Sequence, residues 1–383
     1  MLIQLSNSAV PAHDTRQQRR LWHDGGRQSL SLGCARCPDQ GVCGGLQVEC
    51  GVFDCLGFCC QNPADCDTVC RKKPDEFARR VREVGGFAFS NVPRAPVLQA
   101  PSLPKLVPIL FHACKRVAPF QAASVVCLPL YRVLRRQDGN TRYGNPLDLA
   151  EGFGISRGMS VILTGTATDP PLERWWSLGP LRRDAIRALR GLNIALVTTP
   201  NYSLFIDQPR WDDLHSMKRI ALVHEEFLSE GLPAALHVNA RTERDWSRWR
   251  DYIVARAEVT HIAFEFATGA GCAGRIEWHA NELVRLAADV GRPLHLVVRG
   301  GGKVLPALMT AFSDITVLET SAFIKTMHRQ RAALTSTGMV SWRQSATKPT
   351  ETLDALLTEN WHVVAASYAG LFDRSVLSLE AAK

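Results

Sequence analysis

The fold is decided by a stretch in the second half of the chain, THIAFEFATGAGCAGRIEWHANELVRLAADVGRPLHLVVRGGGK (residues 260–303). Its two ends, THIAFEF (260–266) and PLHLVVRG (293–300), are apolar runs too short for a helix and typical of buried strands. Between them, residues 275–291 have apolar positions at helical spacing and end on Gly291, where the glycine that follows a helix is expected. A strand, a helix and a second strand in this order indicate a parallel βα unit.

The same pattern recurs along most of the chain. Short apolar runs occupy residues 107–113, 123–130, 160–166, 193–200, 233–239, 260–266, 293–300 and 315–321. Helical patterns lie between the later runs, at 181–192, 210–231, 243–257, 275–291 and 303–312. Strands that alternate with helices predict an α/β fold, and eight candidate strands favour a TIM-barrel-like (βα) domain.

The first pair of runs does not fit this pattern well. Only residues 114–122 separate them, fewer than the about ten to twelve residues that a parallel crossover requires. Either this pair is a hairpin or the barrel is incomplete, with an irregular first strand pair. An open doubly wound α/β sheet is the alternative fold.

The length of 383 residues and the composition, 46% hydrophobic and 21% charged, fit a soluble barrel with an added module. Composition shifts divide the chain into five predicted parts. These are a flexible basic arm (1–33), a cysteine-rich lobe (34–73), a helix with a proline-rich connector (74–106), the barrel-like domain (107–335) and a C-terminal helical extension (336–383).

Membrane and secreted classes are not expected. No apolar run approaches the ~20 residues of a spanning helix, and the N-terminal residues lack the continuous apolar region of a secretory signal. We therefore expect a cytoplasmic protein without a membrane partner.

The formal net charge is +8, and residues 86–160 hold nine Lys and Arg residues but three Asp and Glu residues. This surplus indicates either a patch for phosphates or nucleic acid, or a solvated face that maintains solubility.

Cysteines are concentrated near the N-terminus. Nine of the twelve lie close together: Cys34, Cys37, Cys43, Cys50, Cys55, Cys59, Cys60, Cys66 and Cys70. Disulfides need an oxidising compartment, whereas metal ligation suits a reducing cytosol. The Cys34–Cys37 spacing is that of a chelating pair, and no histidine lies inside the cluster, which indicates an all-sulfur site. We expect an iron–sulfur cluster of the 4Fe–4S type, with zinc as the alternative, in a structural rather than a redox role.

Polar residues gather where the predicted strands end, which is where both candidate folds place their sites. The candidate acid, base or nucleophilic groups are Asp207, His237, Glu265 and Glu319. The candidate ligand-binding residues are Asn201, Tyr202, Asn239, Arg241, Arg299, Gly300, Gly301, Gly302 and Lys303. The alternative interpretation is that these groups cap the helices that follow, but Glu and Arg are poor N-caps.

Two glycine-rich stretches precede predicted helices, TGAGCAGR (268–275) and RGGGK (299–303). Backbone N–H groups of such loops can hold an anion, and barrel enzymes often bind phosphate after the seventh strand, where RGGGK would lie. Arg299 and Lys303 add positive charge to that loop. Ordinary turn chemistry is the alternative for both stretches.

The segment PNYSLFIDQPRWDD (200–213) follows a predicted strand. It resembles the hallmark of an uncharacterised bacterial and phage family, a domain of unknown function with a Pro-[Asn/Asp]-[Tyr/Phe]-Ser-Leu…Asp-x-Pro segment. The resemblance covers this segment and the βα series to about residue 325, and it leaves out the cysteine-rich lobe. It implies a phage or mobile-element context, which favours a nucleic-acid-related role, and it implies no particular activity.

These observations lead to one main hypothesis and two alternatives. The main hypothesis is a metal-containing barrel enzyme that acts on a phosphate-bearing ligand, such as a nucleotide, DNA or RNA, by acid–base hydrolysis or group transfer, with the cysteine-rich lobe as a cover. The first alternative is a non-catalytic metal-containing nucleic-acid-binding protein, and the second is a redox-sensing iron–sulfur protein. The sequence leaves the oligomeric state open.

Overall fold

The computed structural model describes residues 29–30, 47–48, 74–99, 101–204, 210–268, 275–346, 348 and 350–380. The chain divides into two units. Unit 1 comprises Met1–Asn91, Ser203–Lys218 and Ala240–Arg248, and unit 2 comprises Val92–Tyr202, Arg219–Asn239 and Trp249–Lys383. Within unit 1, the short strands β1 (Ser29–Leu30) and β2 (Gln47–Val48) pair antiparallel, and helix α4 (Pro74–Glu83) precedes the 3-10 turn η3 (Phe89–Asn91).

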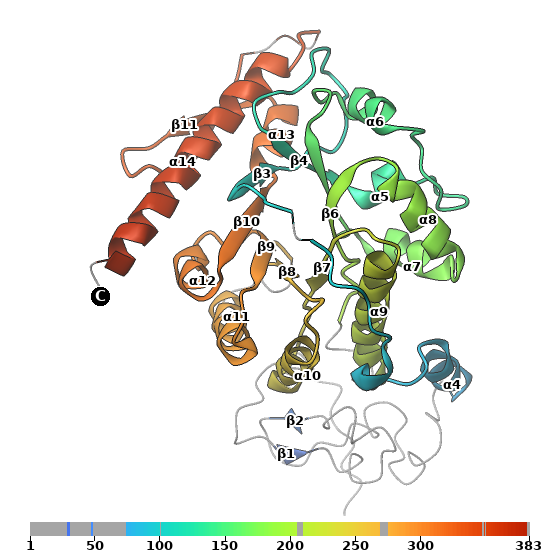
Figure 1. Cartoon of the computed structure of the whole chain (residues 1–383). Helices are drawn as coiled ribbons and strands as arrows, with labels where there is room; N and C mark the ends of the chain where they lie inside the picture. Colours follow the sequence, from blue (N-terminus) through green and yellow to red (C-terminus); the bar gives the residue numbers. More distant parts are fainter. Residues whose placement is uncertain are drawn as a thin grey trace, which may run out of the picture. The chain divides into compact units, whose positions relative to one another are not determined.

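Unit 2 contains an eight-stranded parallel sheet that curves into a nearly closed barrel surrounded by helices (Figure 1). The strands are β3 (Leu106–Pro108), β4 (Val125–Pro129), β5 (Ser160–Thr164), β6 (Ile194–Thr198), β7 (Ala234–His237), β8 (His261–Glu265), β9 (His295–Arg299) and β10 (Asp314–Glu319). The spatial order is β3-β10-β9-β8-β7-β6-β5-β4, and all neighbouring strands in this order pair parallel. The predicted TIM-barrel-like fold is therefore confirmed, and the open doubly wound sheet is wrong.

The barrel has one seam, between β3 and β4. A single parallel bridge between Ile109 and Cys127 connects these strands, and the Leu110 amide donates to the Cys127 carbonyl at 2.9 Å. The first strand pair is therefore parallel, so the predicted hairpin is wrong. The alternative, an incomplete barrel with an irregular first strand pair, agrees with this seam. Residues 109–124 make the crossover without a helix.

Buried side chains line the inside of the barrel in a regular row. Inward-facing residues of all eight strands form one apolar cluster, which consists of Val107, Ile109, Val125, Cys127, Ile162, Leu196, Ala235, Ala263, Val297 and Leu318. The residues between them face the helices, and most are also buried, so each strand lies between two apolar layers. Burial on both faces explains why the sequence shows continuous apolar runs instead of alternation.

Helices follow each strand from β4 onward (Figure 1). They are α5 (Leu130–Val133), α6 (Pro146–Phe153), α7 (Asp169–Ser177), α8 (Leu181–Arg190), α9 (Arg210–Ser229), α10 (Glu243–Val254), α11 (Ile276–Val290), α12 (Leu305–Ala311) and α13 (Ser321–Met327). Local sequence sets several of their ends. Asn145 accepts hydrogen bonds from the amides of Leu147 and Asp148 at the start of α6, and Gly291 ends α11 at a φ of 64°.

After the barrel, a hairpin and a long helix complete unit 2. Strands β11 (Gln330–Leu334) and β12 (Val340–Gln344) pair antiparallel, and α14 (Asp354–Glu380) packs against β11, α13, α12 and β3. The Trp361 indole of α14 donates to the carbonyl of Ala122 at 2.9 Å, inside the crossover that has no helix of its own. Among the described residues, no helix combines the length and apolar character needed to cross a membrane.

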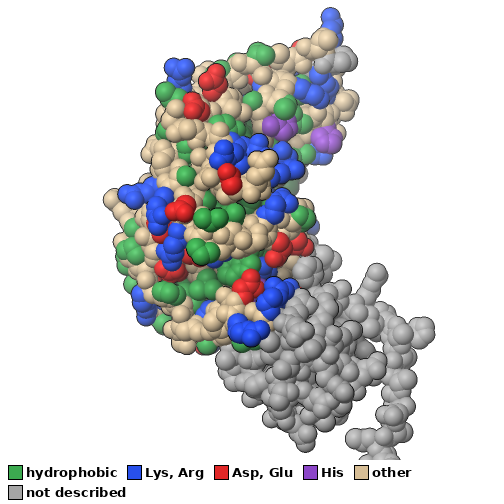
Figure 2. Space-filling model, turned by 90° about the vertical axis from the view of Figure 1, so that its right-hand side faces the viewer, with side chains coloured by type: hydrophobic (Ala, Val, Ile, Leu, Met, Phe, Trp, Pro, Cys, Tyr) green, Lys and Arg blue, Asp and Glu red, His purple; other side chains and the backbone are tan. Residues whose placement is uncertain are grey.

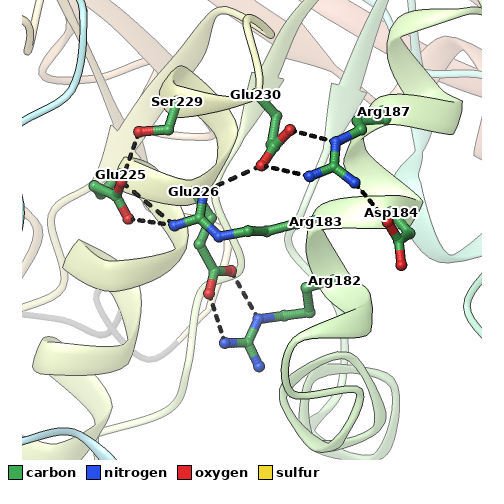
Figure 3. Close-up of polar contacts among 8 residues, drawn as sticks. All are labelled: Arg182, Arg183, Asp184, Arg187, Glu225, Glu226, Ser229 and Glu230. Atoms are coloured by element: carbon green, nitrogen blue, oxygen red, sulfur yellow. Dashed lines mark hydrogen bonds and ion pairs between the residues drawn. The ribbon is translucent and has the colours of Figure 1, made fainter.

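Charged side chains join α8 to the end of α9 (Figure 3). Arg182 forms two hydrogen bonds with the Glu226 carboxylate, both at 2.7 Å, and a third with the Trp176 carbonyl at 2.6 Å. Its guanidinium also lies over the Trp176 ring, 4.3 Å from the centroid. Arg187 bonds to Glu230 and Asp184 in the same network, but its side chain is 57% exposed, against 8% for Arg182.

We expect the Arg182→Ala substitution to lower the free energy of unfolding by about 2–3 kcal/mol, because it leaves the Glu226 carboxylate and the Trp176 carbonyl without this partner in a largely buried place. Arg187→Ala is the matched control, with an expected loss below about 1 kcal/mol because its ion pairs are exposed. Urea denaturation of both variants measures the difference. Equal losses would show that burial does not govern this network.

Candidate active site at the carboxyl ends of the barrel strands

Five polar side chains share the carboxyl end of the barrel interior. They are Thr164, Thr198, His237, Glu265 and Arg299, each two residues beyond a member of the inner apolar row on strands β5 to β9. Because side chains alternate along a strand, these residues face the same interior as that row. The barrel therefore changes from an apolar to a polar layer at the end where barrel enzymes place their active sites.

Glu265 and Arg299 form the charged pair of this layer. They are register partners on β8 and β9, and the Arg299 Nε lies 2.7 Å from the Glu265 Oε2. The Glu265 side chain is 3% exposed, whereas that of Arg299 is 20% exposed. Burial raises the pKa of Glu265, although the Arg299 charge and a hydrogen bond from the Ala267 amide act in the opposite direction. Glu265 is thus a buried carboxyl group with a pKa shifted toward neutral pH, as a general acid or base requires.

His237 is the uncharged member of the layer. It is 3% exposed, and burial, followed by the positive charge of Arg299, lowers its pKa to about 3. The imidazole is therefore neutral at physiological pH. Its Nδ1 atom is buried without a hydrogen-bond partner among the described residues. A neutral imidazole with an unused ring nitrogen can donate or accept one hydrogen bond to a bound ligand.

Two hydroxyl groups at the end of β6 bond to the backbone of the neighbouring strands β7 and β5. Thr199 Oγ1 accepts a hydrogen bond from the His237 amide at 2.8 Å, and Thr198 Oγ1 accepts one from the Gly165 amide at 3.0 Å. Gly165 has no room for a side chain, since a Cβ there would lie 2.4 Å from the Thr198 carbonyl oxygen. The loops after β5 and β6 are consequently packed backbone to backbone at this end of the barrel.

The RGGGK loop follows the seventh strand of the barrel, as the sequence predicted. Gly300 and Gly301 adopt φ angles of 78° and 77°, which favour glycine, and a Cβ on Gly301 would lie 2.6 Å from the Phe266 ring. Gly302 faces open space and Lys303 is exposed. The loop turns sharply against Phe266 and leaves two positive side chains, Arg299 and Lys303, at its two ends.

The predicted amide and tyrosine residues are also near strand ends. Asn239 Nδ2 donates to the Asn201 Oδ1 and to the Tyr202 carbonyl, both at 2.9 Å, so it connects the loops after β6 and β7. Tyr202 is fully buried, and the Arg219 guanidinium lies over its ring at 4.0 Å. In unit 1, Arg241 donates to the Leu204 carbonyl. These contacts stabilise loops, and within unit 2 Asn201, Tyr202 and Asn239 belong to the loops that follow β6 and β7.

Glu319 faces away from the polar layer. Leu318 belongs to the inner row, so the next residue points out of the barrel. Its carboxylate accepts hydrogen bonds from the Ser321 amide at 2.6 Å, from the Ser321 hydroxyl and from the Ala322 amide at 3.0 Å. Glu319 thus caps α13, which is the alternative role that the sequence left open.

Two inward-facing residues, Thr198 and Cys127, are not among the candidates that the sequence indicates. Strand β6 is apolar on both faces, which hides Thr198, and Cys127 lies far along the chain from the nine clustered cysteines. Burial raises the pKa of the Cys127 thiol, which is therefore protonated at neutral pH and has the character of a core side chain. Counting by twos from the inner residue Leu196 would have identified Thr198.

Several predicted residues lie outside the described part of the chain. They are Asp207, residues 269–274 of the first glycine-rich stretch, and all nine clustered cysteines, Cys34, Cys37, Cys43, Cys50, Cys55, Cys59, Cys60, Cys66 and Cys70. Among the residues that are described, no group of three or more His, Cys, Asp or Glu side chains is arranged to hold a metal ion. The metal site in the cysteine-rich lobe stays a prediction.

Comparison with models of protein families gives no match, and no curated protein matches the chain. The resemblance of residues 200–213 to the bacterial and phage family therefore stays a prediction, and the site itself is the basis for a functional conclusion.

Proposed function

We propose that unit 2 is a barrel enzyme that acts on a phosphate-bearing ligand by acid–base chemistry. One observation supports this most strongly: the buried Glu265 carboxyl group, its partly exposed partner Arg299 and the neutral His237 occur together in the polar layer at the carboxyl end of the barrel. A barrel stabilised only by apolar packing has no use for a buried ion pair, because desolvating two charges costs free energy.

Each of these groups has a role in the proposed reaction. Arg299 and Lys303, at the two ends of the glycine loop, bind the phosphate by charge and by hydrogen bonds. Glu265 transfers a proton, because burial raises the pKa of its carboxyl group above the usual value and so favours the protonated form more than in water. His237 orients the ligand through one hydrogen bond without adding charge. The reaction class is hydrolysis or group transfer.

The Glu265→Gln substitution tests this proposal. We expect it to lower turnover by about 10²–10⁴-fold, because the amide cannot transfer the proton, while its similar shape preserves the fold. Turnover is measured by chromatography after incubation with phosphomonoesters, nucleotides and short oligonucleotides. The control is Glu277→Gln, on the exposed first turn of α11 of the same βα unit, which should retain wild-type turnover.

A Glu265→Gln variant that is as active as the wild-type protein on the same substrate would rule out the assignment of Glu265. Melting temperatures of both variants, measured on the same preparations, separate a chemical defect from an unfolded protein.

We further propose that residues 34–70 hold an iron–sulfur cluster, with zinc as the alternative, in a structural role. The support is the cysteine spacing: Cys34 and Cys37 form a chelating pair, and the pairs Cys55/Cys59 and Cys66/Cys70 are each four residues apart. Anaerobic purification with metal analysis and visible absorbance distinguishes the outcomes. Iron with sulfide supports the cluster, zinc supports the alternative, and a protein free of both metals rejects the proposal.

A further inference from the structure

A groove of unit 2 lies beside the barrel, outside the polar layer. It is lined on one side by the segment after β4, including Tyr131, Arg135 and Arg136, and on the other side by α7, including Arg174. The groove is open to solvent, and its space together with the adjoining solvent is about 340 Å³. Figure 2 shows the side of the molecule on which Figure 1 places α5, α7 and α8, and Lys and Arg side chains gather across it.

The groove has an excess of positive charge that the described residues do not neutralise. Arg135 is held by Asp138, with Nε–Oδ1 and Nη2–Oδ2 distances of 3.2 and 2.7 Å. Arg136 and Arg174 are both exposed, and within the described part of the chain neither has an acidic partner at ion-pair distance. Two unneutralised guanidinium groups from the two sides of one groove favour an anionic ligand, and guanidinium geometry suits phosphate oxygens.

The groove is built on rigid elements. Gly139, with a φ of 69°, lies so close to Leu178 of the opposite side that a Cβ would be 2.3 Å from its Cδ1 atom. Trp175, which also lines the groove, is 2% exposed and stacks on Phe227 with a centroid distance of 5.9 Å. A ligand would therefore find the two sides already in place and would lose little free energy in ordering them.

The groove lies at the same end of the barrel as the proposed active site. Tyr131 is the second residue after β4, and its hydroxyl donates to the carbonyl of Gly165, the first residue after β5, at 3.3 Å. Gly165 in turn contacts the Thr198 carbonyl of the polar layer. Since all strands of the barrel are parallel, one ligand can extend from the groove toward Arg299 along the carboxyl ends of the strands.

We propose that this groove binds the sugar–phosphate backbone of a single nucleic-acid strand whose end is the ligand of the barrel. The inference rests on the proposed function and names its ligand class. Charges on both sides of an open groove suit an extended polyanion better than a small molecule, which needs enclosure. The surplus of Lys and Arg over residues 86–160 includes Arg135 and Arg136, and Arg174 of α7 extends it.

Fluorescence anisotropy with labelled single-stranded DNA and RNA oligonucleotides tests the proposal. The Arg136→Ala, Arg174→Ala double variant should bind about tenfold or more weakly than the wild-type protein, because two charge-assisted contacts are lost. The slope of log affinity against log salt should become shallower by about 1.4, since each single-strand phosphate contact contributes about 0.7.

The matched control is Arg157→Ala combined with Arg190→Ala. Both residues are exposed, and they precede β5 and β6, so they lie at the amino end of the barrel. This variant loses the same net charge away from the groove and should retain affinity within about twofold. Equal weakening by the two double variants would overturn the proposal, as would wild-type binding that does not depend on salt.

Two further measurements separate this proposal from other outcomes. An acidic polypeptide, polyglutamate, that displaces the oligonucleotide at equal charge concentration would show that the groove recognises charge and not nucleic acid. Glu265→Gln should bind oligonucleotides like the wild-type protein while losing turnover. Turnover of small phosphate esters without oligonucleotide binding would reject the groove as a nucleic-acid site and leave the proposed function intact. Oligonucleotide binding without turnover of any substrate would reject the proposed function and leave the groove as a binding site.

Discussion

Lowering the pH from 7 to 5 is expected to reduce the free energy of unfolding by about 5 kcal/mol, an upper value that counts three buried histidines at about 1.5–2 kcal/mol each. Burial lowers the pKa of His224 and of His261 to about 4, and that of His237 to about 3. Each of the three side chains is at most 3% exposed and has one ring nitrogen buried without a partner among the described residues.

The sign follows from comparing the two states. In the unfolded chain a histidine binds a proton as the pH falls through its usual value of 6.5, whereas in the folded protein these three bind it only near pH 4 or 3. Between these values the unfolded chain binds more protons, so stability is complete above pH 6.5 and falls as the pH decreases toward 4. Glu265 opposes this trend, because a carboxyl pKa raised by burial adds stability on protonation, but it is one group against three.

The geometry around His261 explains why protonation is so unfavourable there. Its ring stacks on that of His295 with centroids 4.7 Å apart, at the amino end of the barrel interior. Burial also lowers the pKa of His295. His295 Nε2 is bonded to the Thr316 hydroxyl at 2.8 Å, and His261 Nδ1 to the Thr260 hydroxyl at 3.0 Å. A proton on either ring would place a charge next to the other inside an apolar barrel.

Urea denaturation at pH 7, 6 and 5 measures the effect. His261→Gln, which cannot bind a proton in this range, should reduce the loss between pH 7 and 5 by about 2 kcal/mol. The control is His362→Gln, because His362 is exposed on α14 and should leave the pH dependence unchanged. A free energy of unfolding that stays constant from pH 7 to 5 would contradict the assignment of these histidines as buried and neutral.

The strands and helices of unit 2 could be predicted from sequence because their apolar periodicity is strong. Each of the eight predicted runs overlaps one strand of the barrel, and Glu265 and Arg299, chosen because they end strands, are register partners in the structure. Strand ends in a parallel barrel meet at one end by topology alone, so no distant contact had to be known.

The direction of each side chain could not be predicted in the same way. Strand β10 is buried on both faces, so its sequence shows no alternation that would separate the inner residue Leu318 from the outer residue Glu319. Glu319 therefore looked equivalent to Glu265, although it caps a helix. The groove was also invisible in the sequence, because Arg136 and Arg174 come from segments that only the packing of α7 brings together.

The irregular crossover between β3 and β4 depends on contacts that sequence patterns do not reveal. Arg116 is buried there and donates hydrogen bonds to the carbonyls of His112, Phe153 and Gly154 at 2.9, 2.6 and 3.0 Å. From the other side, the Asp354 carboxylate at the start of α14 accepts bonds from the amides of Val117 and Ala118. These bonds replace those that a helix would have made within itself.

We expect Arg116→Ala to lower the free energy of unfolding by about 3–5 kcal/mol, because three carbonyl groups lose their donor in a place that water reaches poorly. Arg116→Lys should recover only part of the loss, since one ammonium cannot bond to three carbonyls in the fork geometry of a guanidinium. Arg132→Ala, an exposed arginine of the same basic segment, is the control, with an expected change within about 0.5 kcal/mol.

Hydrogen exchange measured amide by amide shows where in the barrel the Arg116→Ala substitution acts. If Arg116 holds the seam closed, the Leu110 amide, which donates to Cys127 across it, should lose protection in Arg116→Ala more than amides of the β8–β9 pair on the barrel's continuous side. Protection lost equally at both places would show that the substitution weakens the whole barrel and that Arg116 has no special role at the seam. An unchanged free energy of unfolding would show that α14, through Asp354 and Trp361, is sufficient to hold the crossover.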